Sequence, residues 1–356
     1  MGEGMGENKT TISDIAKVVN MAPSTVYKAL SGNKGVSEPN RHRILQVSEE
    51  LGYISKTSKS NSSSKIVAVV LPDPSVLDFE FYEFIWKGVR KRARELSSVG
   101  LEIKEYMFNG SIDDQLKILW RIVDESRCKS SENRIDGLVT LIWNENPFLG
   151  VIDECCKSGI PVFTVFSDAP SSQRIASVRA NSYQTGRLAA EYLGSTIPND
   201  GSVIITGTRR NAFSHEKVVR GFIDQMAVTN PDIQVIELYE NKNGSMNHIQ
   251  VVKNMIESVP DVRGIYANNA RTTSLIGKLL LHSPHKDSLK IIGSEVSEES
   301  VFYLNHGVVN ALIDEKPSSQ GYQSISLAYD FLCMGLPVKQ TNYVSLNLVL
   351  QNNVPE

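Results

Sequence analysis

The first 55 residues place apolar side chains at the intervals of short helices and not in the alternation of strands. A stripe of this kind is formed by Ile12, Ile15, Ala16 and Val19. Thr11 precedes the stripe, and Asp14 stands three residues later, which is the pattern of a capping box at a helix start. The sequence therefore predicts a first helix that begins directly after Thr11.

Two further short helices follow in the same region. Asn20-Met21 can form a tight turn, and Pro23 suits the first position of a second helix that stops at Ser31-Gly32-Asn33. A third helix has Ser37 as its N-cap and ends at Gly52. The pattern thus indicates a three-helix unit over residues 10–54.

The composition changes abruptly between Ser55 and Lys65, where Ser, Lys, Asn and Thr prevail without a large apolar residue to bury. This is typical of a linker. After it, strand-sized apolar runs alternate with helical segments. We expect strands near 66–71, 101–107, 137–142, 161–166, 202–206, 233–238, 263–267 and 289–293. The intervening helices are expected near 80–97, 112–127, 147–158, 182–195, 214–228, 245–258, 270–283 and 297–305.

Repeated βα units of this length predict parallel sheets with helices on both faces. The eight strands fit either one closed barrel or two open sheets. The repeat breaks near the end of the chain, with a strand-like stretch at 308–313, a helix near 319–334 and a last strand at 343–350. This irregularity favours two sheets joined by several crossing segments over a barrel.

The composition adds limits to this picture. A 356-residue chain with 41% hydrophobic and 22% charged residues is long enough for two or three globular domains, and it excludes coiled coils and long-range disorder. The longest apolar runs, such as Ile66 to Leu71, are far shorter than the roughly 20 residues of a membrane span. Residues 1–9 lack the apolar stretch of a secretory signal, so we expect a disordered N-terminus and a cytoplasmic protein. The four cysteines show no C-x-x-C spacing, so we expect buried thiols.

Charge is distributed unevenly along the chain. Residues 1–65 contain nine Lys or Arg against six Asp or Glu, whereas the whole chain has a net charge of −3. A basic N-terminal region followed by an acidic remainder indicates that the N-terminal region binds a partner with a phosphate backbone. A solvated helical face gives the same signature.

Two short helices around a tight turn match the helix-turn-helix, whose second helix enters the major groove of double-stranded DNA. Base edges or neighbouring phosphates are then faced by Pro23, Ser24, Thr25, Tyr27 and Lys28. Phosphate donors are expected at the start of the first helix, from Thr10, Thr11 and Ser13. The alternative interpretation is a small helical subdomain with a solvated face.

Several different short motifs are distributed through nearly the whole chain. The first region contains Thr11-Ile-Ser-Asp-Ile-Ala-Lys, Ser24-Thr-Val-Tyr-Lys-Ala-Leu-Ser-Gly, Val36-Ser-Glu and Leu51-Gly-Tyr. The rest contains Gly88 after an aromatic pair, Ile160-Pro-Val, Tyr183-Gln-Thr-Gly-Arg-Leu-Ala, Arg220-Gly-Phe, Ala267-Asn-Asn, and Pro317 followed by Gln320-Gly-Tyr. Together these motifs resemble the lactose-repressor (LacI) family of bacterial transcription regulators.

The resemblance implies an all-α helix-turn-helix headpiece followed by an α/β core of two Rossmann-like parallel-sheet subdomains, similar to periplasmic binding proteins. The N-subdomain is expected at about 66–178 and 315–338, and the C-subdomain at about 179–314 and 339–356. The family further implies a homodimer on a pseudo-palindromic operator, commonly as a repressor. A sugar or sugar phosphate between the subdomains would switch the operator affinity. The coupling free energy between ligand binding and operator binding can be no larger than the ligand's preference for one conformational state of the protein over the other.

The headpiece departs from the family pattern. The family usually caps the recognition helix with Ser and has Arg where Lys28 stands, whereas Ala22 cannot cap and Lys28 lacks a bidentate fork. Lys28 therefore suits a phosphate as well as a base, and Tyr27 either adds a contact or packs. Ala22 and Asn33 complete the expected DNA-facing set. The linker lacks the family's Leu wedge for the minor groove, so we expect it to be disordered away from DNA.

Ligands of parallel α/β sheets lie beyond the carboxyl ends of the strands, and this rule selects the pocket candidates. In the N-subdomain they are Phe79, Phe81, Tyr82, Trp143 and Asp168. By resemblance, Phe81 and Tyr82 fall on the aromatic pair that sandwiches a sugar ring, while core packing is the equal alternative. The family often has Asp-Arg where this chain has Phe166-Ser167, so Asp168 is the expected substitute.

The C-subdomain offers a more polar set of candidates. They are Arg209, Asn211, His215, Asn268, Asn269 and Glu295, with Glu315 in the crossing segment before Pro317. By resemblance, Glu295 replaces an Asp that bonds sugar hydroxyls, and Glu315 replaces a Gln. Carboxamides and carboxylates suit a polyol because they bind hydroxyls as donors or acceptors. The longer or charged replacements indicate an effector other than plain ribose or a purine.

Two other classes of function compete with a regulator. An enzyme would need chemistry that the sequence does not offer, since no G-x-G-x-x-G follows a strand and no P-loop, Ser-His-acid or metal-ligand spacing stands out. We therefore expect no catalysis, no cofactor and no metal. A sugar-binding protein of the same core without DNA binding is opposed by the three-helix unit.

Overall fold

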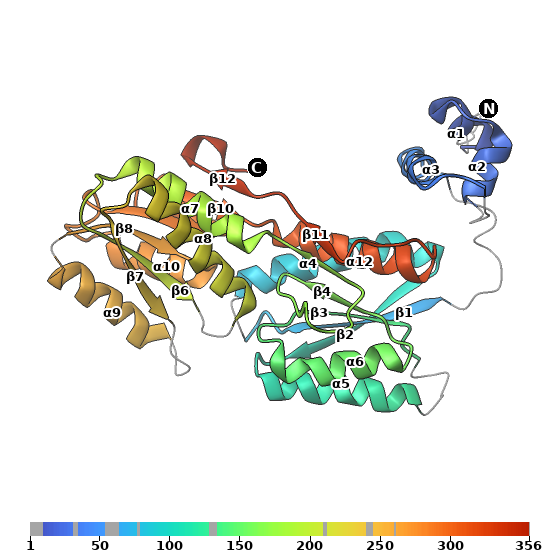
Figure 1. Cartoon of the computed structure of the whole chain (residues 1–356), viewed down its shortest axis with the longest axis horizontal. Helices are drawn as coiled ribbons and strands as arrows, with labels where there is room; N and C mark the ends of the chain where they lie inside the picture. The colour runs from blue at the N-terminus through green and yellow to red at the C-terminus, as the bar shows by residue number, and fades with distance from the viewer. Residues whose placement is uncertain are drawn as a thin grey trace, which may run out of the picture.

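The computed structural model describes residues 10–30, 35–53, 64–76, 79–127, 134–208, 212–239, 245–259 and 261–355. Along the chain it forms a three-helix unit and two α/β lobes, each built on one six-stranded sheet (Figure 1). The expected disorder of residues 1–9 and of most of the linker falls outside the described residues.

The three-helix unit, which we call the headpiece, contains α1 (Ile12–Val19), α2 (Pro23–Leu30) and α3 (Glu38–Glu50). The predicted capping box is present, because the Asp14 carboxylate accepts the Thr11 backbone N–H at 2.9 Å and Asp14 N donates to Thr11 Oγ1 at 3.3 Å. Ser37 stands at the N-cap of α3 without a side-chain cap bond. The headpiece core is formed by Ile15, Ala16, Val19, Val26, Ala29 and Ile44.

The first lobe is an all-parallel sheet with the strand order β11-β5-β4-β3-β1-β2. Its strands are β1 (Lys65–Pro72), β2 (Leu101–Phe108), β3 (Gly137–Thr140), β4 (Val162–Val165), β5 (Ala176–Arg179) and β11 (Thr341–Tyr343). Helices α4 (Phe79–Leu96) and α12 (Pro317–Leu332) cover one face, and α5 (Ile112–Arg127) and α6 (Leu149–Lys157) cover the other.

The second lobe repeats this plan with the strand order β12-β10-β9-β8-β6-β7. Its strands are β6 (Ser202–Thr208), β7 (Gln234–Tyr239), β8 (Val262–Ala267), β9 (Lys290–Ser294), β10 (Ala311–Asp314) and β12 (Asn347–Val349), of which β12 is antiparallel to β10. The helices are α7 (Ser182–Thr196) and α8 (Phe213–Thr229) on one face, with α9 (Ser245–Ser258), α10 (Ala270–Leu280) and α11 (Glu298–Asn305) on the other.

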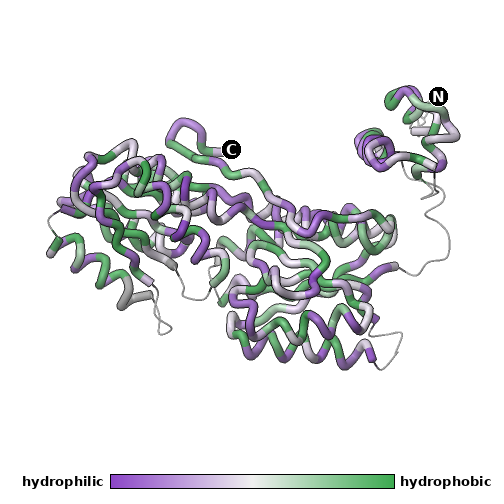
Figure 2. The backbone as a smooth tube through the Cα atoms, in the orientation of Figure 1, coloured by the Kyte–Doolittle hydropathy of each residue, from purple (hydrophilic) through white to green (hydrophobic). Residues whose placement is uncertain are grey.

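Burial on both faces explains the continuous apolar runs of the central strands. Residues 67–72 of β1 are all buried, whereas edge strand β2 is buried only at its two ends, Leu101 and Phe108, and is exposed or half-buried between them. Along the tube of Figure 2, the long helices alternate between apolar and hydrophilic stretches.

Among the described residues, no helix combines the length and apolarity needed to cross a bilayer. Cys155, Cys156 and Cys333 are free thiols, and Cys128 lies outside the described residues.

Three segments cross between the lobes: β5 to α7, β10 to α12, and β11 to β12. The prediction of two sheets joined by crossing segments is therefore confirmed. Two details of the predicted order of strands were wrong. Strand β5 was not predicted, and the single last strand over 343–350 is two strands in different sheets. Because Thr341–Tyr343 pairs with β5, the chain returns to the second lobe after residue 343 and not at residue 339.

Candidate DNA-binding and effector-binding sites

Helix α2 presents one polar face to solvent. Its apolar positions Val26 and Ala29 are buried in the headpiece, so the helical period turns Ser24, Tyr27 and Lys28 outward. Tyr27 is 48% exposed, which settles its role against packing in the headpiece core. Pro23 is also exposed and Thr25 is half-buried. The side chains predicted to face DNA on this helix therefore share an accessible surface.

The start of α2 lacks a side-chain cap, as predicted from Ala22. The exposed Ala22 contributes only its carbonyl oxygen, which accepts from Thr25 N at 2.9 Å and from Val26 N at 3.2 Å. Asn33, predicted to contact DNA after this helix, lies outside the described residues.

Two of the three predicted phosphate donors at the start of α1 are used inside the headpiece. The Thr10 hydroxyl donates to the Leu51 carbonyl at 2.6 Å and so ties the N-terminal segment to the end of α3. The Thr11 hydroxyl donates to Asp14 Oδ2 at 2.6 Å. Both hydroxyls thus donate within the headpiece in the absence of DNA, and their contacts with phosphate stay a prediction. Ser13 is exposed and remains a candidate donor.

One cation of the basic N-terminal region also has an internal task. The Arg41 guanidinium is buried, and its Nη1 donates to the Ala29 carbonyl at 2.8 Å, near the C-terminal end of α2. A cation at this end is favourable because the last carbonyls of a helix carry partial negative charge. Arg41 therefore fixes α2 against α3 and does not contribute to an exposed basic face.

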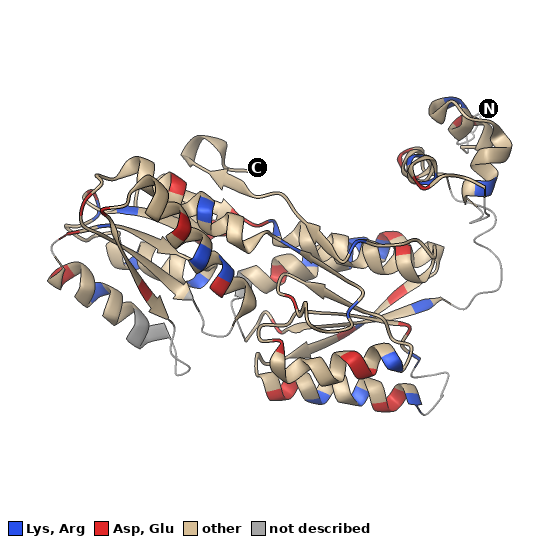
Figure 3. Cartoon of the chain, viewed as in Figure 1, with Lys and Arg blue, Asp and Glu red and all other residues tan. Residues whose placement is uncertain are grey.

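Figure 3 shows that both signs of charge are spread over the helices of the two lobes.

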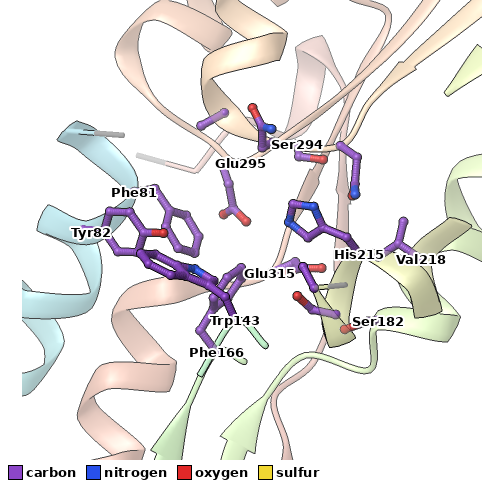
Figure 4. A pocket seen from close by; sticks show the side chains of 15 residues that line it. Phe81, Tyr82, Trp143, Phe166, Ser182, His215, Val218, Ser294, Glu295 and Glu315 are labelled. Carbon is purple, nitrogen blue, oxygen red and sulfur yellow. The ribbon is translucent and has the colours of Figure 1, made fainter. Parts of the chain in front are cut away.

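A cavity lies between the lobes, at the carboxyl ends of their strands. It has a volume of about 710 Å³, including the part open to solvent. Of the predicted first-lobe residues, it is lined by Phe81, Tyr82 and Trp143. From the second lobe and its crossing segment it is lined by His215, Asn268, Asn269, Glu295 and Glu315. The strand-end rule thus located eight of the predicted residues in one cleft (Figure 4).

The first lobe contributes an aromatic wall to the cleft. Phe81 packs edge-to-face on Phe166 with ring centroids 4.6 Å apart, and Tyr82 lies 6.4 Å from Trp143 in a similar geometry. Phe81 and Tyr82 are largely buried and belong to the core cluster of the first lobe, yet both line the cavity. Phe81 and Tyr82 therefore pack in the core of the first lobe and also line the cavity, so core packing and ligand contact do not exclude each other.

The chain crosses into the left-handed backbone region at two matching points of the cleft. Phe166 follows β4 with φ +66° and Glu295 follows β9 with φ +69°. In each lobe the residue's N–H donates at 2.8 Å to the next strand, to Val178 O and to Ile313 O respectively. Such a conformation is unfavourable for a residue with a Cβ and is concentrated at functional sites. It turns both side chains into the cavity (Figure 4).

Three buried polar atoms that belong to lining residues have no partner within the described part of the protein. They are Ser214 Oγ, Asn268 Nδ2 and Glu295 Oε2. A buried polar atom without a partner is unfavourable by about 1–3 kcal/mol, so such atoms are normally satisfied by a ligand or water. The cleft therefore offers a hydroxyl, an amide donor and a carboxylate oxygen to a polar ligand.

The two acidic residues of the cleft are electrostatically unusual. Burial, with the nearby charges of Glu315 and Asp314, raises the pKa of Glu295 well above its usual range. Burial also raises the pKa of Glu315 to about 7, although Thr185 Oγ1 donates to Glu315 Oε1 at 2.8 Å and opposes the rise. Perturbed carboxyls gathered in a cleft are typical of a functional site.

Asp168 does not belong to this cleft, contrary to the prediction. Its carboxylate is fully buried and accepts hydrogen bonds from Thr164 Oγ1 at 2.8 Å, from Arg174 Nη2 at 2.7 Å and from Arg174 Nε. Arg179 Nε lies 3.4 Å from Asp168 Oδ2. The left-handed turn at Phe166 directs Phe166 into the cleft and leaves Asp168 to hold the first lobe together. Arg209 and Asn211 lie outside the described residues, as does the side chain of Phe79.

Residues 68–336 match the family model of the periplasmic binding protein domain. Residues 11–56 match the model of the bacterial regulatory proteins of the lacI family. The chain belongs to the periplasmic binding protein domain family and carries a lacI-family headpiece. The predicted resemblance to LacI-family regulators and the predicted fold class are therefore confirmed.

Curated proteins to which this chain is similar are transcriptional regulators. The HTH-type regulator GalR of Streptococcus thermophilus is 35% identical over 92 residues, which cover 24% of this chain and 28% of GalR. The HTH-type regulator DegA of Bacillus subtilis is 21% identical over 166 residues, which cover 46% of this chain and 45% of DegA. The chain thus matches these relatives over less than half of their lengths.

Solved structures with the same core include sugar-binding proteins. GanP, a glucose-galactose binding protein from Geobacillus stearothermophilus, is 25% identical with a TM-score of 0.71, over 83% of this chain and 100% of GanP. A carbohydrate transporter solute binding protein from Agrobacterium radiobacter, in complex with D-arabinose, is 21% identical with a TM-score of 0.71, over 83% of this chain and 96% of that protein. The second similarity shows the fold alone.

Sequence reasoning missed several lining residues, among them Phe166, Ser182 and Ser294, whereas it expected the helix start at Ser214 and His215 to face the cleft. Phe166 was noted only as a departure from the family's Asp-Arg. Ser182 begins α7 directly after a lobe crossing, so it does not carry the strand-end signal. Within the described residues, no group of three or more His, Cys, Asp or Glu is arranged to hold a metal ion.

Proposed function

We propose that the chain is a DNA-binding transcriptional regulator, acting as a repressor, whose affinity for its operator is set by a small polyhydroxylated ligand in the cleft between the lobes. The observation that carries this proposal is the combination in one chain of the exposed α2 face and a cavity with unpartnered buried polar atoms. A helix of eight residues fits the major groove, and the polar atoms need a ligand.

The ligand class rests on the cleft and on its relatives. Aromatic rings on one side and amide, hydroxyl and carboxyl groups on the other suit a sugar ring, which has apolar faces and a polar rim. GanP is described as a glucose-galactose binding protein, and its structure aligns with 83% of this chain. We therefore propose a sugar or sugar derivative as the effector, bound by the eight predicted lining residues together with Phe166, Ser182, Ser214 and Ser294.

The operator side of the proposal requires two copies of the chain. One headpiece exposes a single short recognition helix, and two such helices on a two-fold axis read two half-sites of a pseudo-palindrome. A homodimer in the cytoplasm is the proposed form, with a regulatory and not a catalytic activity. The contacts to DNA are assigned to Ser13, Pro23, Ser24, Thr25, Tyr27 and Lys28.

The proposal is tested by comparing the full chain with a variant that begins at residue 64. A duplex selected from a random library by the full chain serves as the probe in gel-shift measurements at two salt concentrations. We expect the full chain to bind and to lose at least about tenfold in affinity between 50 and 200 mM salt, because phosphate contacts release counterions. The shortened variant should fail to bind while sugars still raise its melting temperature. Retention of DNA binding by the variant would contradict the headpiece assignment.

A further inference from the structure

The charged side chains in the described lining of the cleft are of one sign. Glu295 and Glu315 both reach the cavity, and no Lys or Arg is found among the described residues that line it. The exposed fraction of Glu295 is 4%, so solvent screens its charge poorly. In Figure 4 both carboxyl groups point toward the centre of the cavity, with the ring of His215 beside them. The pocket thus gathers two acidic groups whose charged forms a bound cation would stabilise.

Only part of this carboxyl pair is satisfied by the protein. Glu315 Oε1 accepts the Thr185 hydroxyl at 2.8 Å, and the buried Glu295 Oε2 has no partner within the described residues. Asp314 lies near both and adds a third negative charge to their surroundings. The backbone holds Glu295 in this position through a left-handed conformation, since its N–H donates to Ile313 O at 2.8 Å. A group that binds between the two carboxyls would relieve their repulsion if it were positively charged.

The opposite side of the cleft is suited to the same charge. Four aromatic rings, from Phe81, Tyr82, Trp143 and Phe166, line the cavity. Aromatic faces attract a cation by their quadrupole. They also pack on the apolar face of a sugar ring. An aromatic wall opposite buried carboxylates therefore fits a ring-shaped body that carries a cationic nitrogen.

We propose that the effector is an amino sugar or a related aminated polyol, whose protonated amine binds between Glu295 and Glu315 while its ring packs on the aromatic wall. The hydroxyls of such a ligand would find Ser214 Oγ and Asn268 Nδ2, which have no partner among the described residues. This inference rests on the proposed function of the cleft as the effector site, and it adds the charge of the ligand.

The test is calorimetry of the full chain with matched sets of sugars. The sets are D-glucose, D-glucosamine and N-acetyl-D-glucosamine, and the three corresponding forms of D-galactose and D-mannose. We expect at least one free amine to bind at least tenfold more tightly than both of its neutral counterparts. Equal or tighter binding of the neutral members, or no binding of any free amine, would overturn the proposal.

The outcome for the proposed function is read separately on the operator. If a neutral sugar binds and changes operator affinity, the effector site stands and only the charge assignment fails. If the chain does not bind a selected duplex at all, the regulator proposal itself fails. If the free amine binds preferentially and shifts operator affinity, both proposals are supported.

Isosteric variants connect the preference to the two carboxyls. Glu295→Gln and Glu315→Gln each retain the shape of the side chain but cannot become negatively charged beside a bound amine, and we expect each to reduce the amine-over-neutral preference at least tenfold. Glu298→Gln, at the exposed start of α11, is the matched control and should leave the preference unchanged. A merely structural role for either glutamate would weaken amine and neutral sugar alike. Equal losses for both ligands would therefore count against the proposal.

Discussion

Lys28 is the single exposed cation of the recognition helix, among the residues that the structure describes there. It lies one residue from Tyr27 on the accessible face of α2, where a charge meets a base edge or a phosphate of a bound duplex. We expect Lys28→Ala to weaken operator binding about tenfold and to leave effector affinity unchanged, because the cleft lies in the lobes. Fluorescence anisotropy with a selected duplex measures the first, and calorimetry the second. Arg43→Ala removes the same charge from exposed α3 and should have a smaller effect; an equal loss would argue against a specific contact of Lys28.

Asp168 shows how a residue that appears functional in the sequence can be structural. Its fully buried carboxylate is held by Arg174, Arg179 and Thr164, so removing it leaves two guanidinium groups without their partner. We expect Asp168→Ala to lower the free energy of unfolding by about 3 kcal/mol or more, as for other broken buried ion pairs, without changing effector affinity more than threefold. Urea denaturation and calorimetry measure these quantities. Asp113→Ala, exposed on α5, should change stability by less than about 1 kcal/mol. A large loss of effector affinity in the folded Asp168 variant would return the residue to the binding site.

Glu315 predicts a pH dependence of stability. Its pKa is raised to about 7 by burial, whereas in the unfolded chain it has the ordinary value near 4.5. Between these values the folded protein binds more protons, so the free energy of unfolding falls as the pH rises from about 4.5 to 7, by up to about 3 kcal/mol. Melting temperatures of the unliganded protein between pH 5 and 8 should show this decline. Glu315→Gln should reduce the decline and Glu298→Gln should retain it; an unchanged slope in Glu315→Gln would contradict the assignment.

At the scale of elements, each lobe contains one pair of helices whose backbones nearly touch. In the first lobe a Cβ on Gly88 of α4 would lie 1.8 Å from Ser318 O, and in the second a Cβ on Gly186 of α7 would lie 1.9 Å from Val218 O. Gly321 and Gly221 occupy the facing helices and are equally confined. The Gly88, Gly186, Gly221 and Gly321 motifs that carried the family resemblance are therefore explained by helix packing.

Substitution of these glycines should separate the helices. We expect Gly88→Ala to lower the free energy of unfolding by about 2 kcal/mol or more, because the backbone of α12 must move away. Gly150→Ala on α6 is the matched control, since a Cβ there meets nothing within 4 Å, and it should be neutral or stabilise by up to about 1 kcal/mol. Thermal and urea denaturation measure both. A neutral Gly88→Ala would show that the α4 and α12 contact is more yielding than the structure indicates.

Element prediction succeeded where apolar runs were long and failed where they were short. Ile66 to Leu71 is a run that only a buried strand explains, and β1 lies there. Strand β5 alternates apolar and polar residues from Ala176 to Arg179, but four residues are too few for that alternation to identify a strand. Thr341–Tyr343 is shorter still, and its sheet is decided by pairing with β5, a tertiary contact. The boundary between the lobes therefore could not be derived from local pattern.

The cleft was predictable to the extent that strand ends determine it. Trp143, Asn268 and Glu295 were found because parallel strands deliver their carboxyl ends to one edge of a sheet. Asp168 was misplaced because the left-handed turn at Phe166 reverses which side chain enters the cleft, and the sequence around it does not signal that backbone conformation. Ser182 reaches the cleft at the start of α7, a placement that depends on how the lobes meet.

At the scale of the whole molecule, side chains and backbone groups of the two lobes are in contact across the cleft. Phe213 N at the start of α8 donates to Trp143 O of the first lobe at 3.1 Å, and the Arg179 guanidinium lies 5.5 Å from the Phe213 ring and 5.0 Å from the Tyr343 ring. These contacts involve two of the three crossing segments, at Arg179 and Tyr343. A ligand that favours one arrangement of the lobes over another changes the lobe equilibrium, and any effect on DNA is limited by that preference.

The proposed homodimer makes a geometric prediction about the operator. Each headpiece offers one recognition helix of eight residues, so a half-site alone supplies few contacts, while two half-sites on one duplex combine through effective concentration. We expect the full palindrome to bind at least about a hundredfold more tightly than either half-site. Inserting about five base pairs between half-sites should abolish the gain, because it turns one half-site to the opposite side of the duplex. Anisotropy titrations of the three duplexes measure this, with sedimentation to give two chains per palindrome. Equal affinities for palindrome and half-site would show instead that a single headpiece binds independently of its partner.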